Sequence, residues 1–167
     1  KFELFEWYPS PQIIFEFYLD GLSGVMMILI SGLSLVIQLF STSYMSKDEK
    51  YTKYFEYFNF FVFSMLLLVL SGNFLVMFFG WELVGLSSYL LISFWYEKNS
   101  AAKAGNKAFI LNRIGDFGFL IGLMMILNYF ETFNFVNIFE SVLIKQPSNL
   151  DLIILFLLLG AFGKSAQ

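Results

Sequence analysis

The chain has 167 residues, of which 58% are hydrophobic and 14% are charged, and its formal net charge is −3. Ordinary soluble proteins carry roughly a quarter charged residues, so this composition excludes a soluble domain and indicates an integral membrane chain. The acidic balance argues against nucleic-acid binding, and the absence of cysteine and histidine excludes disulfides and the usual ligands of zinc, iron–sulfur clusters and haem.

Continuous apolar segments predict an all-α, polytopic membrane helix bundle, because strands of a membrane barrel would alternate between polar and apolar residues. Residues 1–18 carry acids and aromatic rings, and we expect them to lie outside the membrane on its outer side. Residues 19–167 then form the membrane domain. About five helices are expected in it, at roughly 19–40, 57–70, 74–94, 107–129 and 150–167.

The last of these segments is too short to cross a membrane. The stretch from Leu152 to Gln167 would be about 24 Å long as a helix, against a hydrocarbon core of roughly 30 Å. We therefore expect it to be a half-helix of a broken span or to continue beyond these residues. Gly160, Gly163 and Ser165 suit a broken helix.

Lysines gather in two of the connections between the predicted helices. Residues 41–56 hold Lys47, Lys50 and Lys53, and residues 95–107 hold Lys98, Lys103 and Lys107. Short connections rich in lysine stay on the cytoplasmic or matrix side, so both are predicted to face that side. The 23 phenylalanines, against six alanines, suggest the A+T-rich coding of an organelle, which favours the mitochondrial inner membrane.

Glu82 is the only charged residue between Tyr57 and Tyr96. An ionised acid at the centre of a bilayer costs roughly 2.5–3.5 kcal/mol, so such residues face a protein interior or a wet cavity and often mark an ion route. It lies about 12 Å into its helix, and Gly85 at i+3 leaves room beside the carboxylate for water or a neighbouring helix. We interpret Glu82 as a proton site; the alternative is a structural ion pair between helices.

Lys164, in the last predicted helix, is the natural partner for Glu82. If that helix enters near Asp151, its backbone lies about 20 Å deep, past the midpoint of the membrane. A lysine and a glutamate paired there could pass a proton. The alternative is that Lys164 reaches back to the membrane surface, as lysines near helix ends often do.

Two further charges, Arg113 and Asp116, are three residues apart on the fourth predicted helix and can pair on one face. A structural pair that lowers the cost of inserting both charges is the favoured interpretation. Asp20 is expected to cap the first helix. A stripe of small residues for close helix packing follows on the fourth helix: Gly115, Gly118 and Gly122.

Several sequence blocks resemble one family in order and spacing. They are Leu-Asp-Gly-Leu-Ser (19–23), Gly-Trp-Glu-Leu-Val-Gly-Leu-Ser-Ser-Tyr-Leu-Leu-Ile (80–92), Lys-Ala-Phe (107–109), Asn-Arg-Ile-Gly-Asp-Phe-Gly (112–118) and Gly-Lys-Ser-Ala-Gln (163–167). Together they resemble NADH dehydrogenase subunit 5, the distal antiporter-like subunit of respiratory complex I. The Arg-Ile-Gly-Asp block separates this family from the sister subunits 2 and 4.

The resemblance implies roles for the four membrane charges. Glu82 matches the family's glutamate on its fifth helix and Lys164 the lysine on its broken seventh helix, a pair held to belong to the proton pathway. Arg113 and Asp116 match the charges that open the sixth helix. The five predicted helices correspond to the third to seventh of the family, so the chain is expected to be a fragment or a split piece.

The resemblance also implies which cofactors and partners to expect. This chain would hold no cofactor, and FMN, iron–sulfur clusters and ubiquinone would lie in partner subunits. Its expected partners are other membrane-arm subunits, especially the neighbouring antiporter-like subunit, whatever chain or segment supplies the rest of subunit 5, and lipids. Two alternatives stay open: a subunit of a multi-subunit cation/proton antiporter, and a purely structural segment of the membrane arm.

Overall fold

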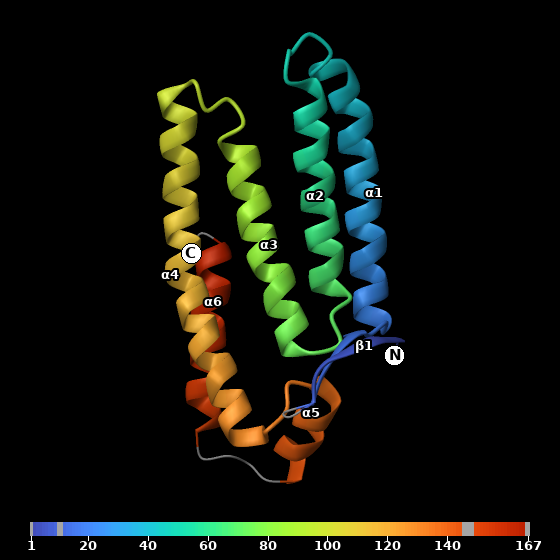
Figure 1. Ribbon diagram of the computed structural model, residues 1–167, viewed down its shortest axis with the longest axis vertical. Helices are drawn as coiled ribbons and strands as arrows, with labels where there is room; N and C mark the ends of the chain where they lie inside the picture. The colour runs from blue at the N-terminus through green and yellow to red at the C-terminus, as the bar shows by residue number, and fades with distance from the viewer. Residues whose placement is uncertain (1, 10–11, 145–148, 166–167) are drawn as a thin grey trace.

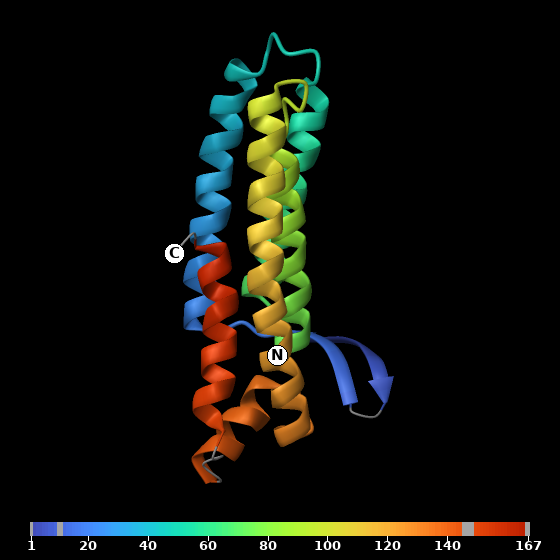
Figure 2. The same ribbon diagram turned by 90° about the vertical axis from the view of Figure 1, so that its left-hand side faces the viewer.

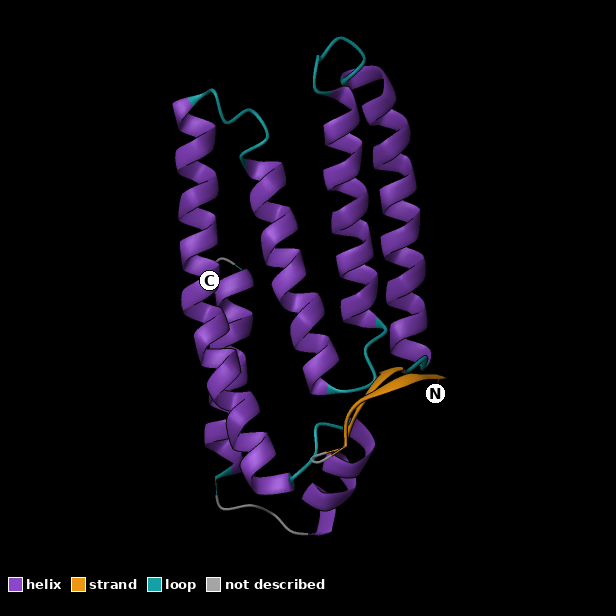
Figure 3. Cartoon of the chain, in the orientation of Figure 1, coloured by secondary structure: helices purple, strands orange, loops and turns teal. Residues whose placement is uncertain are grey.

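The computed structural model describes residues 2–9, 12–144 and 149–165. Within these ranges a hairpin of two strands is followed by six helices (Figures 1 and 3). The elements are β1 (Phe2–Pro9), β2 (Gln12–Phe17), α1 (Gly21–Tyr44), α2 (Tyr51–Val69), α3 (Phe74–Ile92), α4 (Asn99–Phe130), α5 (Phe135–Ile144) and α6 (Leu150–Lys164).

The long helices α1 to α4 run up and down side by side, and α6 returns along one half of α4 (Figures 1 and 2). One end of the bundle, here called the lysine end, carries the connections 45–50 and 93–98. The other, here called the hairpin end, carries β1, β2, the turn between α2 and α3, and α5 (Figure 1). The prediction that both lysine-rich connections lie at the same end is therefore confirmed.

Each of the five predicted membrane segments contains a helix, with different limits. The helices α2 and α4 begin earlier than expected, and α4 reaches 32 residues. Among the described residues, α1, α3 and α4 are each long and apolar enough to cross a membrane. The first turns of α2 carry Lys53 and Glu56, which shortens its apolar part. The described helix α6 has 15 residues and is about 22 Å long, and residues 166 and 167 of the predicted last segment lie outside the described residues.

The segment before the membrane domain forms an antiparallel hairpin, which the sequence analysis did not predict. The phenyl rings of Phe5 and Phe15 stack across the two strands with their centroids 5.3 Å apart. Register shifts interrupt the pairing between Glu3 and Phe5. Each shift breaks the alternation of period two by which a strand is recognised in a sequence. The short helix α5, in the connection after α4, was likewise not expected.

A polar junction at the hairpin end ties the hairpin to the helices. The carboxylate of Glu16, a residue only 1% exposed, accepts a hydrogen bond of 2.6 Å from the Asn134 side chain. The backbone carbonyl of Glu16 accepts from the Gly72 N–H at 2.9 Å, and the side chain of Asn73 donates to the Ile14 carbonyl at 2.7 Å. Asn73 also caps α3 by accepting from the Val76 N–H. The start of α3 is therefore fixed by residues from three separate segments.

The start of α1 is held as predicted. The carboxylate of Asp20 accepts the Ser23 backbone N–H at 2.7 Å, and the Ser23 hydroxyl accepts the Asp20 N–H at 2.8 Å, which completes a capping box. Beyond this cap, α1 packs mainly against α2, and most of its apolar side chains stay exposed. Such a surface suits contact with lipid or with a neighbouring membrane helix.

Glycines set the distance between the packed helices. A Cβ atom on Gly115 would lie 2.9 Å from the Cα of Gly163, so α4 and α6 meet backbone to backbone at this point. Gly118 and Gly122 continue this contact against Leu159 and Leu157 of α6. The predicted small-residue stripe is therefore confirmed, and its partner is α6.

At the lysine end, two polar contacts join the connections. The indole N–H of Trp95 donates to Asp48 at 2.9 Å, and the Lys50 ammonium donates to Glu97 at 2.6 Å. The Trp95 indole and then the Lys50 backbone N–H hold the pKa of the Asp48 carboxyl below its ordinary value. Because a depressed acid pKa stabilises the fold only while the acid is ionised, this contribution is lost as the pH falls through the pKa of folded Asp48.

Replacing Gly115 by valine should separate α4 from α6. Overpacking a tight contact costs roughly 1–3 kcal/mol, so the thermal unfolding midpoint of the protein in detergent or nanodiscs should fall by several degrees. Gly24→Ala is the matched control, because nothing lies within 4 Å of the Cβ position at Gly24. Equal midpoints for the two variants would contradict this account of the packing.

Candidate functional site

Glu82 is the ninth residue of the 19-residue helix α3, about 12 Å from its start and thus near the middle of the bundle. Its side chain is 21% exposed and forms an ion pair with the guanidinium of Arg113 on α4. The Arg113 side chain is 47% exposed, and its guanidinium carbon lies 4.9 Å from the centre of the Phe109 ring. One acid and one base from neighbouring helices therefore balance each other inside the membrane region.

Lys164 ends α6 and points into the bundle. Its side chain is 16% exposed, and the carboxylate nearest to its ammonium is Asp116, with Nζ and Oδ1 3.7 Å apart. Among the described residues the ammonium makes no hydrogen bond. This inward position does not fit the alternative in which Lys164 reaches back to the membrane surface.

Trp81 organises this second pair. Its indole N–H donates to Asp116 Oδ1 at 2.7 Å, and the Lys164 Nζ lies 5.7 Å from the centre of its ring. The ring also stacks on Phe119, with centroids 5.2 Å apart. The aromatic face attracts the ammonium while the N–H fixes the carboxylate that the ammonium faces. Trp81 is a site residue that the sequence analysis missed, although an indole N–H within an apolar segment needs an acceptor and Trp81 directly precedes Glu82 in the sequence.

Gly85 brings Lys164 close to Glu82. A Cβ atom on Gly85 would collide with the Lys164 ammonium, so the end of the lysine side chain occupies the space that the missing side chain leaves on α3. Because Gly85 is one turn after Glu82, the prediction of free room beside the carboxylate is confirmed. Lys164 fills this room.

The four predicted charges do come together, but not in the predicted pairs. Glu82 pairs with Arg113 and not directly with Lys164, and Asp116 faces Lys164 and Trp81 and not Arg113. Arg113 contacts Glu82, whereas Asp116 contacts Trp81 and Lys164, so their spacing of three residues does not join them. Two acids and two bases from α3, α4 and α6 thus form one cluster of zero net charge, here called the charge cluster.

The members of the charge cluster are placed to influence one another's charge. The Asp116 side chain is 5% exposed, and the contacts of Asp116 with Lys164 and of Glu82 with Arg113 bring the four charges together between the helices. Low surrounding dielectric strengthens such interactions, so a change of charge on one member is felt by the other three. The described residues include no group of three or more potential metal ligands.

Comparison with known protein families decides which class of membrane protein this is. Residues 71–167, which include the whole charge cluster, match the family described as NADH:quinone oxidoreductase/Mrp antiporter, TM. The chain belongs to this family. Residues 7–55 match a second model, described as NADH-ubiquinone oxidoreductase (complex I), chain 5 N-terminus.

Several relatives of this chain align with almost its whole length. NADH-ubiquinone oxidoreductase chain 5 of Acanthamoeba castellanii is 46% identical, covering 90% of this chain and 24% of the relative. NADH-quinone oxidoreductase subunit L of Mycobacterium tuberculosis is 42% identical over 99% of this chain and 26% of its own length. NADH-ubiquinone oxidoreductase chain 5 of Metridium senile is 41% identical over 99% of this chain and 28% of its own length. The chain thus spans about a quarter of the length of these relatives.

The pairing of Glu82 with Arg113 predicts coupled effects of substitution in this antiporter-family chain. Glu82→Gln and Arg113→Met should each lower the thermal unfolding midpoint, because each leaves an unpaired charge between helices. The double variant should lose less than the sum of the two, with a coupling free energy of roughly 1–3 kcal/mol. Strictly additive losses would show that the two side chains do not interact.

Proposed function

We propose that this chain is part of a proton-translocating subunit in the membrane arm of NADH:ubiquinone oxidoreductase. It would couple quinone reduction, carried out elsewhere in the complex, to the movement of protons. The observation that carries this proposal is the charge cluster, which lies wholly within the residues that match the antiporter family. The match of residues 7–55 to a complex I chain 5 model supports assignment to subunit 5.

In the proposed mechanism Glu82 and Lys164 carry the proton. Transfer from the Lys164 ammonium to the Glu82 carboxylate yields a neutral amine and a carboxylic acid, and the reverse step restores both charges. Arg113 and Asp116 keep their charges and favour the ionised form of the group beside each of them. Lys164 lies between the Asp116 carboxylate and the turn of α3 that carries Glu82, so a small movement of its flexible side chain changes its partner.

The driving force for this transfer would come from outside the chain. Moving one charge against 100 mV requires about 2.3 kcal/mol, and in this proposal the redox groups that supply it lie in partner subunits. FMN, iron–sulfur clusters and ubiquinone would belong to partner subunits. The partners include the neighbouring antiporter-like subunit and the segment or chain that completes this one. The enzyme would be an H⁺-translocating NADH:ubiquinone reductase.

The proposed location is the mitochondrial inner membrane, with connections 41–56 and 95–107 facing the matrix. Support comes from the lysines in both connections, which lie together at the lysine end, and from mitochondrial-type relatives named chain 5. Bacterial relatives named subunit L also match over nearly the whole chain. The orientation would be the same in a bacterial membrane, with the lysine end facing the cytoplasm.

Two other functions follow from the same features. The matching family includes Mrp antiporters, so a subunit of a cation/proton antiporter is the second candidate. The chain 5 match at residues 7–55 favours complex I over this candidate. A purely structural segment would use the charge cluster only to join α3, α4 and α6, and its loss would then impair assembly before proton pumping.

Glu82→Gln in the assembled complex should lower the number of protons pumped per quinone reduced, because a glutamine side chain cannot take up and release the proton. Glu140→Gln, on the exposed face of α5, is the control and should leave the ratio unchanged. The measurement is proton uptake in vesicles against the rate of quinone reduction. An unchanged ratio in correctly assembled Glu82→Gln complex would remove Glu82 from the essential proton path.

A further inference from the structure

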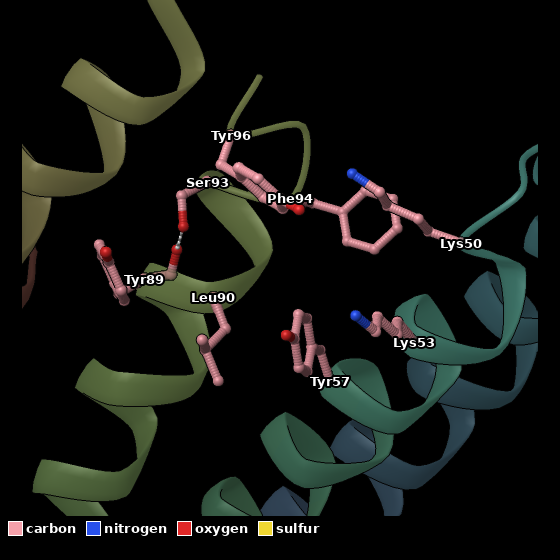
Figure 4. A pocket seen from close by; sticks show the side chains of 8 residues that line it. All are labelled: Lys50, Lys53, Tyr57, Tyr89, Leu90, Ser93, Phe94 and Tyr96. Atoms are coloured by element: carbon pink, nitrogen blue, oxygen red, sulfur yellow. Dashed lines mark hydrogen bonds between the residues drawn. The ribbon is translucent and has the colours of Figure 1, made fainter. Parts of the chain in front are cut away.

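The lysine end holds a second site, separate from the charge cluster. A cavity of about 190 Å³ opens between α2 and α3 (Figure 4). Its walls combine two ammonium groups, aromatic rings and hydroxyl groups. The lining residues are Lys50, Lys53, Tyr57, Tyr89, Leu90, Ser93, Phe94 and Tyr96.

The two lysines differ in the contacts that their ammonium groups make within the chain. The Lys50 ammonium donates to Glu97 at 2.6 Å and lies 4.2 Å from the centre of the Tyr96 ring. The exposed Lys53 has no carboxylate within ion-pair distance in the part of the chain that the structure describes. Both ammonium groups extend from the α2 side toward α3 (Figure 4). Lys53 is therefore the positive charge that the fold leaves available at this cavity.

The other lining residues give the cavity both polar and apolar surface. The Tyr57 side chain extends from α2 into the space between the helices, with its hydroxyl on the side of α3 (Figure 4). The Ser93 hydroxyl is already engaged, since it donates to the Tyr89 carbonyl at 2.6 Å. Leu90 of α3 and the buried Phe94, in the connection that follows α3, supply apolar surface. A ligand that fits this lining has an anionic head and an apolar body.

The position along the helices indicates what kind of anion this is. The apolar stretch of α2 begins at Tyr57, and α3 ends at Ile92, so the cavity lies where both helices leave the apolar layer. Leu86, one turn before Leu90 on α3, is 38% exposed and continues the apolar surface toward the middle of the bundle. Tyrosine and tryptophan gather at membrane interfaces, and basic pockets between membrane helices on the matrix or cytoplasmic side bind anionic headgroups.

We propose that this cavity binds the phosphate headgroup of an anionic glycerophospholipid, with Lys53 as its principal cation and the Tyr57 hydroxyl as a hydrogen-bond donor. The acyl chains then follow the apolar surface of α2 and α3. Bound in this way, the lipid joins the lysine-rich ends of two helices, and α3 is the helix that carries Glu82. The site depends on these helices crossing a membrane and not on the proton-transfer role of Glu82, so the two can fail separately.

The test uses the complete complex in nanodiscs with a photoactivatable phosphatidylglycerol as the probe. Labelling of peptides from residues 50–57 and 89–96 is measured by mass spectrometry. Lys53→Gln should reduce this labelling about five-fold, since one lysine contributes roughly 1 kcal/mol to holding an anionic surface or headgroup. Lys103→Gln is the control, because Lys103 is an exposed lysine of α4 that does not line the cavity. Labelling of the Lys103→Gln complex should match that of the unmodified complex.

A second arm uses the unmodified complex, so the result does not depend on the folding of any variant. Unlabelled phosphatidylglycerol should compete for the site, whereas phosphatidylcholine and millimolar inorganic phosphate should not. Competition by inorganic phosphate would make this a site for a soluble anion and overturn the proposal. Equal competition by phosphatidylcholine, or equal labelling of Lys53→Gln and Lys103→Gln, would show that the headgroup charge is not recognised and would also overturn it.

Discussion

The electrostatic balance of the charge cluster is the constraint on which the rest of this structure depends. A single ion at the centre of a bilayer costs a few kcal/mol, and four ions would exceed the stability of many domains. The chain meets this cost by bringing two acids and two bases from α3, α4 and α6 together, so that each charge faces one of opposite sign. The helices cannot separate without leaving charges unpaired in an apolar layer, which makes the cluster a structural link as well as a candidate proton site.

Close backbone packing makes this balance possible. The short helix α6 reaches Asp116 and Trp81 only because α4 meets it at Gly115 and Gly163 without side chains between them. Gly85 then makes room on α3 for the end of the Lys164 side chain. The positions of glycine along three helices therefore determine where the lysine charge is placed.

The sequence predicted the members of the site better than it predicted their partners. Isolated charges within apolar segments are visible in the sequence, and Glu82 and Lys164 were identified by that criterion. Their pairing depends on how α3, α4 and α6 are rotated about their axes, and no pattern within one helix specifies that. Trp81 was missed for the same reason, since its role depends on Asp116, which lies 35 positions away in the sequence.

The fold, too, was predictable in part: the long helices could be predicted from the sequence, whereas the hairpin and α5 could not. The helices were predictable because long apolar segments without charges have few other possibilities in a membrane. The hairpin was hidden by the register shifts near Glu3, and α5 by its short length. At the junction, the Asn134 side chain donates a hydrogen bond to Glu16, 118 residues away in the sequence, a contact that only the folded chain reveals.

A side-chain-resolved density map of the complete assembled complex would test the central claim most directly. The account predicts the Lys164 ammonium within about 4 Å of the Asp116 carboxylate, beside the Trp81 ring, with Arg113 turned toward Glu82. A map that shows the Lys164 ammonium at the membrane surface, with Asp116 and Glu82 facing bulk water, would contradict it.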